Sequence, residues 1–304
     1  MANEKYWGSV LFFKHLILAV MITLIVVPTI GCIVLLFRCR SLEKELQSIQ
    51  EQISSLQEPE TRTAAAMTWT EGLSYQELYP DLYVDRPLGP ELYESKTIYL
   101  TFDDGPSLEC TAQILDILKE YDIKATFFVV GMNNATPEKT ALLKRIAEEG
   151  HTLGIHSYSH DYNKIYSSTE AFLDDFYQVY QWVYESTGVK PEVFRFPGGS
   201  VNEYNMATCR EIITEMNRRG FRYYDWNMAA NDAVSGGISA DRIVDNILDQ
   251  SRNVVRGVVL MHDSHDKATT VEALPEIITG LQEQGFAFAP LTREVTPVTF
   301  KYIN

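Results

Sequence analysis

From residue 96 onward, apolar positions alternate between short runs with a strand pattern and longer stretches with helical spacing. The short runs are rich in β-branched and aromatic residues and lie at 97–102, 125–130, 153–156, 193–196, 221–226, 258–262 and 286–290. Between them, apolar side chains recur every three or four residues, as on one face of a helix, at 111–121, 138–149 and 169–185. Strands that alternate with helices are typical of a parallel sheet.

This rhythm predicts an α/β fold, and we expect a distorted, seven-stranded (β/α) barrel. Candidate polar residues stand at the carboxyl ends of successive strands, where ligands gather in such barrels. An open doubly wound sheet is the alternative, because it also binds ligands at strand ends. No glycine-rich phosphate loop follows the first strand, which disfavours a nucleotide-binding version.

The N-terminal part has a different pattern, an uncharged apolar run from residue 16 to residue 37. As a helix this run would span roughly 33 Å, close to the hydrocarbon thickness of a bilayer. It is too long for a cleaved signal peptide and no A-x-A site follows it, so we expect an uncleaved signal anchor. A lipoprotein site at Cys32 is disfavoured because the run continues beyond it. Basic residues flank both ends and give no orientation.

After the anchor, a short heptad stripe of leucine and isoleucine runs through residues 42–56. It could pair two chains as a weak homodimer, or it could be a solvated stalk. The chain then divides into a short N-terminal tail (1–15), a transmembrane signal anchor (16–37), a juxtamembrane heptad helix and linker (38–70), a domain-edge segment (71–95), a main domain (96–295) and a C-terminal tail (296–304).

Composition narrows the class of protein only a little. The chain has 304 residues, of which 45% are hydrophobic and 12% aromatic, as suits a globular domain with a large core. Its formal net charge of -15 argues against nucleic acid as a partner, since phosphate binding needs a basic surface. Cys110 and Cys209 are too isolated for metal-ligand spacing, and free core cysteines are the expected reading.

Two polar clusters carry the candidate chemistry. Asp103 and Asp104 stand together at the end of the first strand, and His156 and His160 follow about fifty residues later. One carboxylate and two imidazoles can hold a divalent metal and leave a position open for water. The second carboxylate is then left over to act as a base. A further histidine, His262, ends the strand at 258–262.

The full set of polar clusters resembles the five ordered motifs of the polysaccharide deacetylases. This family includes peptidoglycan N-acetylglucosamine deacetylases and chitin deacetylases and shares the catalytic domain of the chitooligosaccharide deacetylases. The resemblance covers about residues 95–295, so the main domain would be a polysaccharide deacetylase catalytic domain. The motifs here are T-F-D-D-G-P from 101, H-S-Y-S-H from 156, R-F-P-G-G from 195, Y-D-W-N from 224 and L-M-H from 260.

The resemblance implies a role for each of the central residues. Asp104, His156 and His160 would bind the metal, expected to be zinc, with cobalt, nickel or iron as alternatives. Asp103 would be the general base that takes a proton from water. His262 would be the general acid that protonates the departing nitrogen.

Four further residues take supporting roles by the same resemblance. Arg195 would hold Asp103 ionised, Asp225 would orient and charge His262, and Trp226 would pack beside that histidine. Gly198 stands where the family often has an aromatic residue whose backbone N–H helps to bind the oxyanion. The fourth motif also departs from the family, because position 222 is Arg where an Asp is common. Both departures bear on substrate choice.

These expectations combine into a membrane-anchored, metal-dependent hydrolase that removes N-acetyl groups from an amino-sugar polymer. The substrate would be peptidoglycan or a chitin-like oligomer. A single membrane pass would leave the catalytic domain outside the cytoplasmic membrane. An O-acetyl esterase acting on xylan or a wall glycan, and a catalytically silent glycan-binding module, are the alternatives.

Overall fold

The computed structural model describes residues 14–18, 38, 73–132, 134–234 and 237–301. The chain forms two compact units, Met1–Thr70 and Glu71–Asn304. In the first, residues 14–18 are helical. None of the helices in the described ranges is both long and apolar enough to cross a membrane. Apart from residues 16–18, the predicted anchor at 16–37 lies outside the described residues, as does the heptad stripe at 42–56.

The second unit is built on a parallel sheet whose strands run in the order β5-β4-β3-β2-β1-β7-β6. An eighth strand, β8, pairs with the first residues of β1. Strand β2 pairs with the last residues of β1. The pairings are all parallel, and β5 is not paired with β6, so the sheet is an open half-barrel. The strands are β1 (Thr97–Asp103), β2 (Thr126–Val130), β3 (Thr152–Ser157), β4 (Val193–Phe194), β5 (Arg222–Tyr223), β6 (Met228–Ala229), β7 (Arg256–His262) and β8 (Ala287–Phe288).

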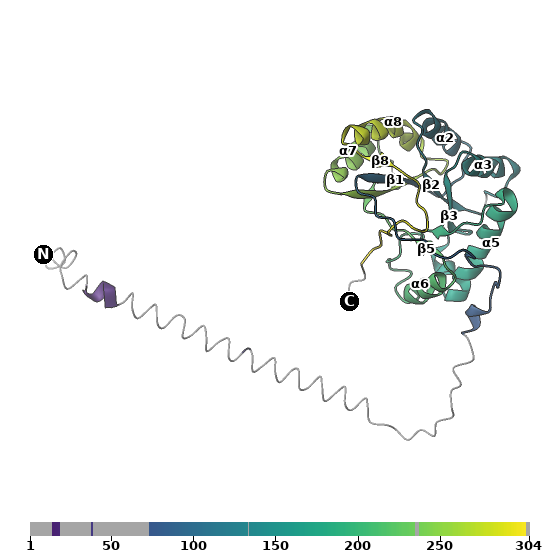
Figure 1. Cartoon of the computed structure of the whole chain (residues 1–304), viewed down its shortest axis with the longest axis horizontal. Helices are drawn as coiled ribbons and strands as arrows, with labels where there is room; N and C mark the ends of the chain where they lie inside the picture. The colour runs from purple at the N-terminus through teal and green to yellow at the C-terminus, as the bar shows by residue number, and fades with distance from the viewer. Residues whose placement is uncertain (1–13, 19–37, 39–72, 133, 235–236, 302–304) are drawn as a thin grey trace, which may run out of the picture. The chain divides into compact units, whose positions relative to one another are not determined.

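Helices lie around these strands, as Figure 1 shows. Four of the eight helices described in this unit begin at a side chain that caps the first turn, such as Thr136, which accepts a hydrogen bond from the N–H of Lys139. The longest helix within the described ranges ends at Gly188 in the left-handed conformation. The elements are η1 (Ser74–Gln76), α2 (Thr111–Glu120), α3 (Pro137–Glu148), α4 (Tyr162–Ile165), α5 (Thr169–Thr187), α6 (Cys209–Arg218), α7 (Ala240–Ser251) and α8 (Ala268–Glu283).

The sequence pattern located every long strand and misread one region. A single strand was expected at 221–226, but β5 ends at Tyr223 and the chain returns to the sheet only as β6, on the other edge. Between them, the Tyr224 hydroxyl donates to the carbonyls of Thr292 and Val295. The N–H of Tyr224 still donates to the carbonyl of Phe194 in β4, whereas the N–H of Asp225 donates to Val298 of the C-terminal segment, a long-range contact that apolar periodicity cannot reveal.

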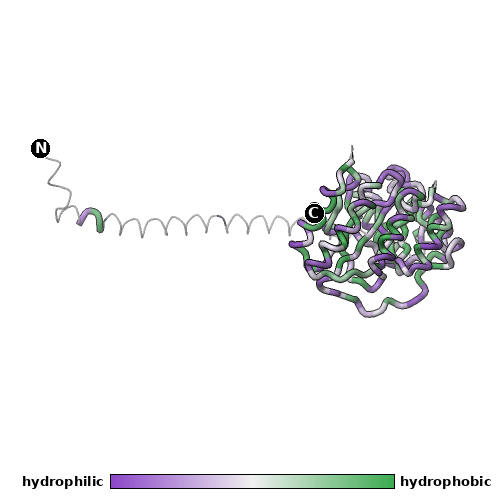
Figure 2. Tube along the Cα trace, turned by 90° about the horizontal axis from the view of Figure 1, so that it is seen from above, coloured by the Kyte–Doolittle hydropathy of each residue, from purple (hydrophilic) through white to green (hydrophobic). Residues whose placement is uncertain are grey.

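Side chains on the two faces of the sheet enter two separate cores. Along β1, Ile98 and Leu100 pack in the larger core beneath the helices, whereas Tyr99 packs in a smaller core with Phe128 and Tyr224. Leu291 and Val295 of the C-terminal segment complete the smaller core. Figure 2 shows the resulting mixture of apolar and polar segments along the trace. Both cysteines of this unit, Cys110 and Cys209, are free and buried.

Candidate active site

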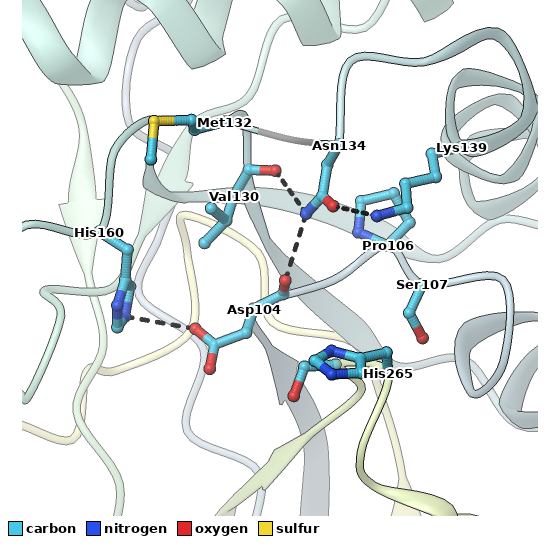
Figure 3. A pocket seen from close by; sticks show the side chains of 10 residues that line it. Asp104, Pro106, Ser107, Val130, Met132, Asn134, Lys139, His160 and His265 are labelled. Atoms are coloured by element: carbon cyan, nitrogen blue, oxygen red, sulfur yellow. Dashed lines mark hydrogen bonds and ion pairs between the residues drawn. The ribbon is translucent and has the colours of Figure 1, made fainter.

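Three predicted metal ligands meet where β1 and β3 end. His160 Nε2 lies 3.3 Å from Asp104 Oδ1, and His156 Nε2 lies 3.6 Å from the same oxygen. The three ligand atoms lie within 4.8 Å of one another. Figure 3 shows the imidazole of His160 pointing toward the carboxylate of Asp104. The arrangement brings together one oxygen and two nitrogen donors from strands that are separated by about fifty residues in the sequence.

The chemical state of these donors fits a divalent cation. His156 Nδ1 lies 2.9 Å from the carbonyl oxygen of Arg195, so Nδ1 carries the proton and the lone pair of Nε2 is turned toward Asp104. Burial lowers the pKa of His156 to about 3, which keeps the ring neutral as a metal ligand must be. Asp104 Oδ1 is buried and accepts no hydrogen bond from the described residues. A bound cation would satisfy that oxygen.

The backbone that carries two of the ligands is strained. Asp104 has φ 77° and His160 has φ 54°, a left-handed conformation that residues other than glycine seldom adopt. Such conformations persist only where the surroundings fix them, and they are concentrated at functional sites. Gly105 is required beside Asp104, because a side-chain carbon there would lie 2.1 Å from Asp263 Oδ2.

A buried carboxylate that the sequence motifs did not indicate holds the segment between the ligands His156 and His160. Asp175 of α5 accepts hydrogen bonds from Ser157 Oγ at 2.6 Å and from the N–H groups of Tyr158 and Ser159 at 2.6 and 2.8 Å. Ser157 Oγ in turn accepts from the N–H of His160. The available signal was an aspartate on the otherwise apolar face of a helix, which indicates a buried polar partner.

The predicted base, Asp103, is the last residue of β1 and is almost fully buried. Arg195, which follows β4, donates from Nη1 to Asp103 Oδ1 at 2.9 Å and to Thr101 Oγ1 at 2.6 Å. Its remaining donors reach the carbonyls of Tyr224 and Asp225. Burial raises the pKa of Asp103, and the adjacent guanidinium acts against that rise. The expected contact between Arg195 and Asp103 is therefore present.

The predicted acid, His262, lies directly across from Asp103 in the pairing of β7 with β1. Its partner is Asp232, whose Oδ1 lies 2.8 Å from His262 Nδ1 and whose Oδ2 accepts from the His262 N–H. Thr270 donates a further hydrogen bond to Asp232. Burial alone would lower the pKa of His262, but the hydrogen bond and charge of Asp232 outweigh it and raise the pKa to about 9. The ring is therefore protonated at neutral pH.

The prediction that Asp225 orients His262 is wrong. The carboxylate of Asp225 accepts instead from the N–H and hydroxyl of Ser200 and from the N–H of Phe300. It thereby joins the loop after β4 to the C-terminal segment. The ring neighbours of Trp226 among the described residues are Phe300, at 4.7 Å, and the guanidinium of Arg195, at 5.7 Å. The expected packing of this indole beside His262 is not seen.

Comparison with known proteins places this site in a family. The family model described as "Polysaccharide deacetylase" matches residues 92–221. A curated relative, the peptidoglycan-N-acetylglucosamine deacetylase of Bacillus cereus, is 34% identical over 216 residues, which are 69% of this chain and 75% of the relative. The chain belongs to the polysaccharide deacetylase family.

Solved structures of other polysaccharide deacetylases and related esterases share the fold. The catalytic domain of a peptidoglycan N-acetylglucosamine deacetylase from Eubacterium rectale is 36% identical, with a TM-score of 0.65, covering 71% of this chain and 97% of that one. A family 4 acetyl xylan esterase from Clostridium thermocellum, solved in complex with a cobalt ion, is 28% identical with a TM-score of 0.54. It covers 65% of this chain and 89% of the esterase.

On one side of the ligand cluster, this polysaccharide deacetylase has a pocket of about 250 Å³. Asp104, His160, Met132, Lys139 and His265 are among the residues that line it (Figure 3). Gly198, the expected oxyanion residue, has φ 73° and lies beside the ring of Tyr162.

Proposed function

We propose that the chain is a zinc-dependent hydrolase that removes N-acetyl groups from N-acetylglucosamine residues of peptidoglycan. One observation carries the proposal: Asp104, His156 and His160 form a ligand set with a buried carboxylate, Asp103, and a protonated imidazole, His262, close by. A base and an acid flanking one metal position are what hydrolysis of an acetamide requires.

A divalent cation held by the three ligands would lower the pKa of its water and polarise the acetamide carbonyl. Asp103, paired with Arg195, accepts the proton of the attacking water. The Nδ1–H of His262 donates a hydrogen bond to Asp232, so Nε2 is the atom that delivers a proton to the amide nitrogen. The C–N bond then breaks, and acetate and a free amine are released. Cobalt, nickel and iron would suit the same donors.

The choice of peptidoglycan rests on the relatives and on the N-terminal pattern. The Bacillus cereus and Eubacterium rectale proteins are named for N-acetylglucosamine in peptidoglycan. An anchor at 16–37 would hold the catalytic unit against the wall, on the outer side of the cytoplasmic membrane. A chitin-like oligomer offers the same acetamido sugar and serves as the soluble test substrate.

The acetyl xylan esterase relative favours one rival, an esterase that acts on O-acetyl groups. Acetate release should be measured from N-acetylglucosamine oligomers, isolated peptidoglycan and acetylxylan, with zinc supplied and Asp104→Asn as the control. The proposal expects acetate from the two amino-sugar substrates and a loss of at least about 100-fold in the variant. Release from acetylxylan alone would establish the esterase. Glycan binding without any acetate release would establish the silent binding module.

A further inference from the structure

Two tyrosines form an aromatic surface that extends outward from the ligand cluster. The ring of Tyr162, in α4, lies 5.3 Å from the imidazole of His160, measured between centroids. The ring of Tyr204, in the loop between β4 and α6, lies 5.2 Å from Tyr162 and meets it edge to face. Tyr162 also lies against Gly198, where an added side-chain carbon would be 3.3 Å from its hydroxyl oxygen. Tyr162 therefore lies beside the metal ligand His160, and Tyr204 is exposed to solvent.

The loop that carries Tyr204 is held in place by its own hydrogen bonds. Asn202 Oδ1 accepts from the N–H groups of Tyr204 and Asn205, at 2.9 and 3.1 Å. The buried side chain of Asn205 accepts from the Asn202 N–H and donates to the carbonyl of Gly199. These contacts fix the backbone on both sides of Tyr204. Its exposed ring is therefore presented by an ordered loop.

Packing does not account for the outer tyrosine. Tyr204 remains 44% exposed, and its neighbour Met206 is 72% exposed, although both stand in a loop next to the catalytic residues. No hydrogen bond involves the hydroxyl of Tyr204 or of Tyr162 among the described residues. An exposed aromatic ring that carries a hydroxyl suits a ligand with one apolar and one polar surface.

We propose that Tyr162 and Tyr204 form a saccharide-binding platform that takes the sugar next to the one being deacetylated. The C–H face of a pyranose ring packs on an aromatic ring, and its hydroxyls can bond to the phenolic oxygens. The inference rests on the proposed function for the identity of the polymer, an N-acetylhexosamine chain. A platform beside His160 should make binding depend on chain length, because Tyr204 lies one ring farther from His160 than Tyr162 does.

The test uses the full chain and compares Tyr204→Ala with Tyr204→Phe and with Tyr184→Ala. Tyr184 is the matched control, since it is also 44% exposed but lies near the end of α5, beside Lys190. On an N-acetylglucosamine tetramer we expect Tyr204→Ala to raise KM about tenfold with kcat nearly unchanged. Tyr204→Phe, which keeps the ring and loses one hydrogen bond, should raise KM by a smaller factor of about threefold, and Tyr184→Ala should stay close to the wild-type KM. For the N-acetylglucosamine monomer all variants should behave alike.

A second readout separates the platform from the chemistry. Binding of the tetramer to the chelator-treated, metal-free protein is measured by calorimetry, and Tyr204→Ala should bind about tenfold more weakly than wild type. If the wild type binds the tetramer more tightly than Tyr204→Ala but the zinc-loaded enzyme releases no acetate, the proposed function is overturned and the platform is still supported. Equal tetramer affinity in wild type and Tyr204→Ala, or an equal loss in Tyr184→Ala, would overturn the platform.

Discussion

At the scale of single residues, the path of the backbone determines which carboxylate bonds to His262 and raises its pKa. Asp225 follows the carboxyl end of β5 and Asp232 follows the carboxyl end of β6, and both are buried. Only Asp232 comes from the loop after β6, which pairs with β7 and so lies beside His262. The sequence offered the more prominent Asp-Trp pair at 225–226, because a two-residue strand such as β6 leaves no clear periodic signal.

The assignment of Asp232 predicts how the acid titrates. In metal-free protein the His262 ring should titrate with a pKa of about 9, and Asp232→Asn should lower that pKa, because burial is then opposed only by the charges of Asp103 and Asp104. The raised pKa also means that the ionised pair stabilises the fold fully below pH 6.5, and this contribution is lost as pH rises through 9. NMR of the histidine ring signals measures the shift.

The matched control for this titration is Asp225→Asn, which removes an equally buried carboxylate that faces Ser200. It should leave the pKa of His262 near 9. We also expect Asp232→Asn to lower kcat at neutral pH by about 100-fold, since less of the acid is then protonated and its Nδ1 has lost the carboxylate partner. A His262 pKa that follows Asp225 and not Asp232 would refute the assignment.

At the scale of elements, the C-terminal segment contacts the chain just after β5 and the first residue of β7. The N–H of Asp225 donates to the carbonyl of Val298, and Arg256 donates to the carbonyl of Thr296. Phe300 then packs against Trp226 and Gly199. The long strands and helices were predictable because their apolar periodicity is local. This segment was read as a tail, because its contacts lie dozens of residues away and leave no periodic trace.

Shortening the chain tests the contribution of this segment to stability. Removal of residues 298–304 deletes two hydrogen bonds to Asp225 and the Phe300–Trp226 contact, a loss of about 3 kcal/mol. We expect Tm to fall by about 6 °C or more. Removal of residues 301–304 alone, which keeps all three contacts, should leave Tm unchanged within about 1 °C. Calorimetry of the three proteins measures both effects, and equal Tm values would contradict the account.

At the scale of the whole molecule, the chain combines a catalytic unit with an N-terminal apolar run. The half-barrel and the ligand set at strand ends could be predicted from the sequence, because each ligand sits in a recognisable motif at the end of an apolar strand. Asp175, Tyr162 and Tyr204 could not be assigned in that way, since their roles arise only when separate loops meet.

The anchor remains a proposal that cell fractionation can test. The full chain should sediment with membranes and resist extraction by high salt and by alkaline carbonate, because an inserted apolar helix is held by the hydrophobic effect and not by charge. A variant without residues 16–37 should appear in the soluble fraction with its deacetylase activity intact. Release of the full chain by salt alone would contradict an inserted anchor.

The most direct test of the central claim is metal reconstitution of the chelator-treated enzyme. Zinc should bind with one equivalent per chain, and acetate release from an N-acetylglucosamine tetramer should return in proportion to the zinc bound. His160→Ala should bind zinc much more weakly and release little acetate at the same zinc concentration. Full acetate release by the metal-free protein, or unchanged zinc binding in His160→Ala, would contradict the assignment of Asp104, His156 and His160 as the catalytic metal site.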